Sequence, residues 1–157
     1  IDEIVLFPMY PQYSTTTTLS SIEDVKNKCA QLDYDPKIRI ILPYHKNPDF
    51  IDMVIDSILT AMDDKEISEY ELLLSAHGLP MSIIKAGDPY EKQIEVTAAL
   101  IEQMLQRRGV VFKSVRLVYQ SKIGSGAWLE PNLVDVLRKP KHLKVIIYPL
   151  AFTIDNS

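Results

Sequence analysis

Five short apolar runs recur along the chain, and the stretches between them show the period of amphipathic helices. Each run is continuous and rich in β-branched residues, which is typical of strands covered on both faces. Because strands alternate with helices, we predict an α/β fold of three layers, α/β/α, with a mainly parallel sheet and right-handed crossovers. The predicted strands span Ile4 to Phe7, Ile38 to Leu42, Glu71 to Ser75, Val115 to Tyr119, and Leu143 to Tyr148.

Three amphipathic helices are predicted between these strands. The first keeps its apolar residues on one face from Ile22 to Leu32, so we interpret Cys29 as a core residue rather than a reactive thiol. The second runs from Asp49 to Met62, and Asn47-Pro48 supplies its start. The third runs from Tyr90 to Arg108, with two arginines in its last turn.

Composition and charge exclude two classes of partner. The chain of 157 residues is 46% apolar and 24% charged, which suits one globular domain over residues 1–157. Its net charge of -4 and the lack of a long Lys/Arg cluster argue against nucleic-acid binding. The longest apolar stretch, Val145 to Ile154, is about half of the roughly 20 residues that a membrane-spanning helix needs. We therefore expect no nucleic acid and no membrane span.

His77 is the first candidate for chemistry. It follows an apolar run, in a segment from Leu74 to Pro80 that reads Leu-Ser-Ala-His-Gly-Leu-Pro. Open α/β sheets bind ligands beyond the ends of their strands. An imidazole there could accept a proton at neutral pH or bind ferrous iron, although a structural histidine bonded to a carbonyl is an equal alternative. His45 and His142 lie in polar segments, and we expect both to be solvated.

Four groups of motifs follow one another in a recognisable order: Tyr10–Ser14, then Leu74–Pro80 with Gly87–Tyr90, then Tyr119–Gly124 with Trp128–Pro131, and finally Pro149–Asp155. In this order they resemble the ferrochelatases, the enzymes that insert ferrous iron into protoporphyrin to make haem. The resemblance runs from about residue 5 to residue 157. It implies the second of two similar Rossmann-like halves, and we expect the chain to be a fragment without its amino-terminal half and carboxy-terminal end.

The resemblance also implies the reaction and its partners. The expected activity is that of a lyase that forms protohaem from protoporphyrin IX and ferrous iron, with iron as substrate metal and no organic cofactor. A bacterial-type cytoplasmic location, peripheral membrane association and the missing half of its own chain are implied as well. Some ferrochelatases carry an iron-sulfur cluster, but a cluster needs four thiolates and this chain has one cysteine, Cys29.

The family pattern assigns His77 the central role, as proton acceptor or as iron ligand. The second metal-site residue of the family belongs to an acidic motif, Asp-His-x-Glu, where this sequence reads Asp155-Asn156-Ser157 and ends before the Glu. Asp155 either orients His77 and relays its proton or caps a following helix. Asn156 replaces the usual histidine.

Several aromatic and hydroxyl residues match positions that line or support the family's cleft. Trp128 is expected either to form a porphyrin-facing wall or to pack its loop onto the domain. Asp88 and Pro89 are predicted to cap and begin the long helix, and so to support the segment that carries His77. The predicted porphyrin-binding residues are Tyr13, Ser14, Ser121, Trp128 and Phe152, and Tyr10 matches the same cleft.

Other functions fit the sequence less well. A nucleotide-binding domain is suggested by Gly124-Ser125-Gly126, but the third glycine is missing. A hydrolase using Ser75, His77 and Asp155 lacks a Gly-x-Ser-x-Gly elbow. A cobalt or nickel chelatase would generally lack the combined motifs, and an inactive porphyrin-binding fragment is the remaining alternative, because one half supplies only part of the contacts around a macrocycle.

Overall fold

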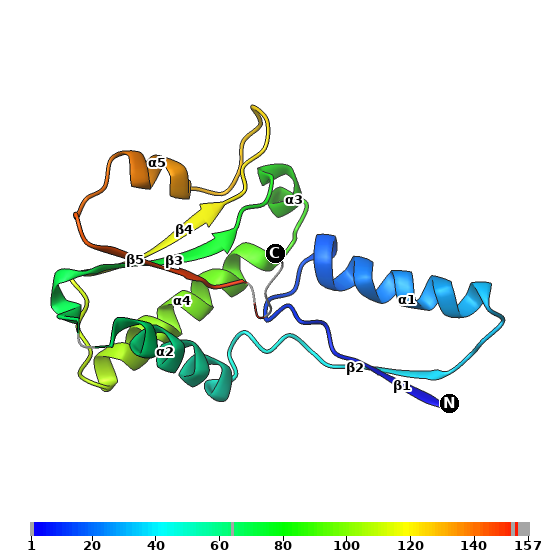
Figure 1. Ribbon diagram of the computed structural model, residues 1–157. Helices are drawn as coiled ribbons and strands as arrows, with labels where there is room; N and C mark the ends of the chain where they lie inside the picture. The colour runs from blue at the N-terminus through cyan, green and yellow to red at the C-terminus, as the bar shows by residue number, and fades with distance from the viewer. Residues whose placement is uncertain (1, 64, 152, 154–157) are drawn as a thin grey trace.

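The structure, a computed structural model, describes residues 2–63, 65–151 and 153, and its strands form two parallel sheets (Figure 1). The α/β class and the parallel pairing are confirmed, but the prediction that all five strands share one sheet is wrong. An apolar run reveals a strand but not its neighbour. In the smaller sheet β1 (Glu3–Leu6) pairs with β2 (Lys37–Ile40), and in the larger β3 (Glu71–His77) lies between β4 (Ser114–Gln120) and β5 (Val145–Pro149).

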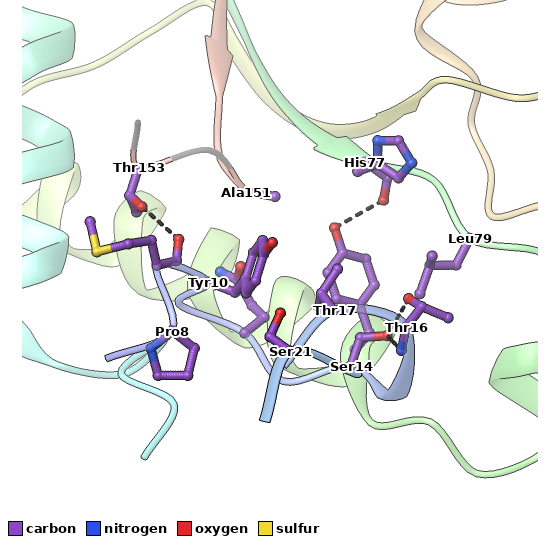
Figure 2. Close-up of a pocket in the computed structure, with 13 residues that line it drawn as sticks. Pro8, Tyr10, Ser14, Thr16, Thr17, Ser21, His77, Leu79, Ala151 and Thr153 are labelled. Atoms are coloured by element: carbon purple, nitrogen blue, oxygen red, sulfur yellow. Dashed lines mark hydrogen bonds between the residues drawn. The ribbon is translucent and has the colours of Figure 1, made fainter. Parts of the chain in front are cut away.

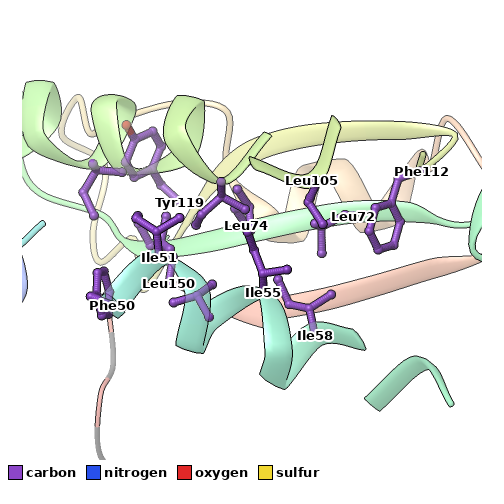
Figure 3. Close-up of a cluster of buried hydrophobic side chains, with 14 of the residues drawn as sticks. Phe50, Ile51, Ile55, Ile58, Leu72, Leu74, Leu105, Phe112, Tyr119 and Leu150 are labelled. Carbon is purple, nitrogen blue, oxygen red and sulfur yellow. The ribbon is translucent and has the colours of Figure 1, made fainter. Parts of the chain in front are cut away.

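The larger sheet has helices on both faces, as predicted. Helices α2 (Pro48–Met62) and α4 (Tyr90–Arg107) cover one face, and α5 (Leu133–Arg138) packs on the other (Figure 1). Successive residues of β3 point to opposite faces, so its first six residues are all buried. Figure 3 shows the core between β3 and the α2/α4 layer, to which Phe50, Ile51, Ile55, Ile58, Leu72, Leu74 and Leu105 contribute.

The smaller sheet belongs to an arm that projects from this body (Figure 1). It consists of β1, the helical turn η1 (Thr15–Leu19), α1 (Ser20–Gln31) and β2. Within α1 only Ile22 is fully buried, Cys29 is half-exposed, and Leu32 just after the helix is 75% exposed. The prediction that Cys29 lies in the core is therefore wrong, because the apolar face of α1 meets too few partners in the described part of the chain.

The helix starts agree with the capping residues of the sequence. Asn47 caps α2 by accepting from two backbone N–H groups, at 2.8 and 3.2 Å. Helix α4 begins at Tyr90, as its periodicity predicts, with Pro89 rather than Asp88 at the cap position, and the Asp88 carboxylate still accepts from the Tyr90 N–H at 2.9 Å. Two short helices, η2 (Ile67–Glu69) and α3 (Met81–Lys85), complete the elements.

A buried charge lies at the start of the larger sheet. Glu71 is fully buried and accepts hydrogen bonds from Arg116 on β4 at 2.6 Å and from Ser114 at 2.8 Å. Burial by itself would raise the pKa of the Glu71 carboxyl, but the hydrogen bonds from Arg116 and Ser114 lower it below its usual value. This pair ties β3 to β4 at the end of the sheet opposite His77.

Candidate active site

A cavity of about 440 Å³ lies where the arm meets the end of β3 (Figure 2). This volume is in the range of small-molecule sites, and the position at the carboxyl end of a parallel strand is the one expected for ligands. Three stretches far apart in the sequence form it: the segment around η1, the end of β3 with the start of α4, and the residues after β5. Its lining consists of Pro8, Met9, Tyr10, Gln12, Ser14, Thr16, Thr17, Ser21, His77, Leu79, Tyr90, Ala151 and Thr153.

His77 is the last residue of β3 and the exposed one in an otherwise buried strand. Its backbone carbonyl accepts a hydrogen bond from the Tyr90 hydroxyl at 2.9 Å, drawn as a dashed line in Figure 2. Desolvation by the surrounding residues lowers the pKa of the imidazole below its ordinary 6.5. At neutral pH the ring is therefore uncharged, the form that accepts a proton or binds a metal.

Gly78 fixes the path of the chain directly after His77. Its N–H donates to the carbonyl of Gln120 at 2.8 Å, and a Cβ added at this position would lie 2.9 Å from that same oxygen. Such a contact is too close for any side chain, so the approach of the two strands requires glycine. The Trp128 ring lies 3.5 Å from the same point, which packs its loop against the end of β3.

The Tyr-Pro-Gln-Tyr-Ser segment forms the opposite wall and is anchored to α4. The buried Gln12 side chain donates to the Thr97 hydroxyl at 3.2 Å. The Tyr13 N–H donates to the Gln93 side chain at 2.7 Å. Ser14 caps η1 and donates to the Asp88 carboxylate at 3.0 Å, so this wall is held by polar contacts.

The profile of the ferrochelatase family matches residues 1–157. The chain belongs to the ferrochelatase family. It is 47% identical over its whole length to the ferrochelatase of Wolinella succinogenes, 43% to that of Sulfurimonas denitrificans, and 42% to that of Helicobacter pylori strain G27. The chain spans about half the length of these curated relatives, 50%, 50% and 47% respectively. The resemblance inferred from the motifs is confirmed.

The structure gathers some of the residues predicted from the ferrochelatase pattern. Tyr10, Ser14 and His77 line the cavity, and their porphyrin-binding or catalytic roles stay predictions. Tyr13, Ser121 and Trp128 do not line it; Tyr13 contributes its backbone to the wall, and Ser121 lies exposed in a left-handed conformation. Phe152 and Asp155 lie outside the described residues.

Sequence reasoning missed part of the cavity lining. Thr16 and Thr17 are not singled out by any motif, and Tyr90 is predicted only as a helix start, although the Gly-Asp-Pro-Tyr motif was a signal for it. Thr153 was missed as well; its hydroxyl donates to the Met9 carbonyl at 2.6 Å. His45 and His142, both expected to be solvated, are each half-buried instead, and desolvation lowers the pKa of His45.

Two observations concern iron and membranes. Among residues 2–63, 65–151 and 153, no three His, Cys, Asp or Glu side chains gather closely enough to hold a metal ion. The expected carboxylate partner, Asp155, lies outside these ranges, so an iron-ligand role for His77 stays a prediction. In the same part of the chain, no helix has the length and apolar character required to cross a bilayer.

Proposed function

We propose that this chain supplies one side of a ferrochelatase active site and that the full-length protein inserts ferrous iron into protoporphyrin IX. One observation carries the proposal: His77, neutral at neutral pH, lines a cavity in a chain that matches the ferrochelatase family throughout. Apolar residues such as Leu79 and Met9 suit the faces of a macrocycle, and the hydroxyl of Thr17 suits its polar edge.

The chemistry requires a base. Two pyrrole protons leave the porphyrin, the metal exchanges its water ligands for four ring nitrogens, and the products are protohaem and two protons. The uncharged His77 imidazole can take one of these protons, and the partly desolvated site favours its neutral form between turnovers. Whether His77 acts as base or as iron ligand, the same neutral ring is needed.

We also propose that the apolar surface of the arm is covered by the remaining polypeptide that the curated relatives possess. Val5 and Phe7 are each 54% exposed and Leu42 is 76% exposed. Parallel strands are normally buried on both faces, and a two-stranded sheet alone is marginally stable. Apolar exposure of this kind marks an interaction surface. The chain spans about half the length of its relatives, and the rest of their length is the polypeptide that we propose as the covering partner.

The finer details stay predictions. These are protoporphyrin rather than coproporphyrin as substrate, a cytoplasmic location, peripheral membrane association, a single domain for residues 1–157, and no organic cofactor or iron-sulfur cluster. The cobalt or nickel chelatase finds no support in the named relatives, all of which are called ferrochelatases.

The proposal is tested by anaerobic insertion of ferrous iron into protoporphyrin, followed by the loss of porphyrin fluorescence. The 157-residue chain is compared with a version extended to the length of its relatives. We expect turnover in the extended protein only, because porphyrin distortion of roughly 1 to 5 kcal/mol must come from contacts on both sides of the ring. No turnover in either version, with cobalt or nickel active instead, would contradict the proposal.

A further inference from the structure

Asp88 holds the first turns of two helices at once. Its carboxylate is 8% exposed. One oxygen accepts from the Thr15 N–H at 2.7 Å, from the Thr15 hydroxyl at 2.6 Å and from the Ser14 hydroxyl at 3.0 Å. The other oxygen accepts from the Tyr90 N–H at 2.9 Å. Two positive helix ends, that of η1 with α1 and that of α4, therefore share one negative charge.

The two helix starts that meet at Asp88 carry opposite parts of the cavity. Ser14 lines it from the arm. Tyr90 lines it from the body and donates its hydroxyl to the backbone of His77. A displacement of either helix start would therefore change the separation between the Ser14 wall and the end of β3.

The bonds to the Asp88 carboxylate differ in charge from the neighbouring contacts of the same wall. The other bonds between this wall and α4 join neutral groups, Gln12 to Thr97 and the Tyr13 N–H to Gln93. Hydrogen bonds to an ionised acceptor are about twice as strong as those between neutral groups. Burial by itself would raise the pKa of Asp88, but the bonds from Thr15, Tyr90 and Ser14 lower it, so the carboxylate stays ionised.

We propose that Asp88 is a positioning residue of the ferrochelatase reaction, which sets the register between the wall that carries Ser14 and the strand end that carries His77. The inference rests on the proposed function and adds to it a residue that does not line the cavity. It acts through two separate branches, one to Ser14 and Thr15 and one to Tyr90.

The joint at Asp88 can be weakened in two steps by two substitutions in the full-length protein. Asp88→Asn removes the charge and keeps one acceptor oxygen, so its NH2 group faces the N–H of either Thr15 or Tyr90 and one of the two branches loses its acceptor. We expect the KM for porphyrin to rise about tenfold, with kcat within about twofold of the parent. Asp88→Ala breaks both branches, and we expect kcat to fall about 10- to 100-fold as well, because the His77 strand end loses its support.

A matched cap variant and a second readout complete the test. Asn47→Ala removes a cap with two backbone bonds from α2, outside the cavity, and should lower the melting temperature without changing KM or kcat. Amide exchange without ligand should speed up at Thr15–Leu19 in both Asp88 variants, and in Asn47→Ala only at α2. If the Asp88 variants lower the melting temperature but leave KM, kcat and exchange at Thr15–Leu19 unchanged, the inference is overturned. If the parent itself inserts no iron but amide exchange at Thr15–Leu19 still speeds up in the Asp88 variants, the proposed function fails. The role of Asp88 in holding the two helix starts together would stand.

Discussion

At the residue scale, His77 shows why a strand end suits this chemistry. The six residues before it are buried, so the backbone is fixed while the imidazole remains accessible. The hydrogen bond from Tyr90 and the close packing at Gly78 hold the same short stretch from two sides. A base held in this way needs little reorganisation when a substrate arrives.

We expect His77→Ala in the full-length protein to abolish iron insertion while changing the free energy of unfolding by about 0.5 kcal/mol or less, since the side chain fills no core. Because the pKa of His77 lies below its ordinary 6.5, the neutral ring persists below that pH. The parent kcat should therefore be flat around neutrality and fall only in more acidic solution.

The measurement is a kcat profile against pH, with unfolding by urea as the stability readout. His142→Ala is the matched control, because this histidine is half-buried, precedes β5 and does not line the cavity. It should keep the parental profile. Retained activity in His77→Ala, or a parental kcat that already declines as the pH falls through 7.5, would refute the role given to this imidazole.

Residues differ in how far the sequence alone reveals them. His77 and Ser14 were predictable because a motif places them beside a strand end or a helix start. The need for glycine at position 78 was not, because it arises from the Gln120 carbonyl on a neighbouring strand. Asp88 was predicted as a cap for α4, but its bonds to Thr15 cross 73 positions of sequence and follow from the tertiary fold.

At the scale of elements, prediction succeeded where a helix had a layer to pack against. The apolar residues of α2 and α4 were assigned to the core, and most of them are fully buried against the larger sheet. The face of α1 has the same spacing, but in the described chain it meets a two-stranded sheet and buries only Ile22. Periodicity shows which face is apolar and does not show what covers it.

The pair of Glu71 and Arg116 should stabilise the joint between β3 and β4. Arg116→Met leaves the fully buried Glu71 without its charged partner, and we expect a loss of about 3 kcal/mol in the free energy of unfolding. The double variant with Glu71→Leu should recover most of this loss, because it removes the stranded charge. Urea unfolding of the parent, the single and the double variant measures both effects.

Acid should have a related effect. The folded pKa of Glu71 is lowered, so its contribution to stability is full above its unfolded pKa of 4.5 and is lost as the pH falls through the folded value. The double variant should lack this part of the acid dependence. A single Arg116→Met variant as stable as the parent would show that Glu71 does not depend on this partner.

At the scale of the whole molecule, the two sheets have unequal support. The larger one holds a continuous core around β3, whereas β1 and β2 contain no fully buried residue. The α/β class could be predicted from the alternation of strands and helices. The division into two sheets could not, because the apolar content of the five runs is similar and pairing depends on contacts distant in sequence.

Hydrogen exchange should reveal this inequality. In the 157-residue chain we expect the amides of β1 and β2 to exchange rapidly and those of β3 and its neighbours slowly, because few buried contacts oppose opening of the arm. In the protein extended to the length of its relatives, the β1 and β2 amides should become protected. Mass-spectrometric exchange on both proteins measures this; equal protection of the arm in the two would contradict the proposal that further polypeptide covers it.

The close approach at Gly78 also limits how this family could diverge. A side chain at position 78 would collide with a backbone oxygen whatever the protein's activity, whereas position 77 is exposed and already carries a side chain. A descendant that abandoned metal insertion would therefore be free to exchange the histidine but would keep the glycine beside it. A relative with glycine at position 78 but no histidine at position 77 would therefore be expected to keep this fold without the metal-insertion activity.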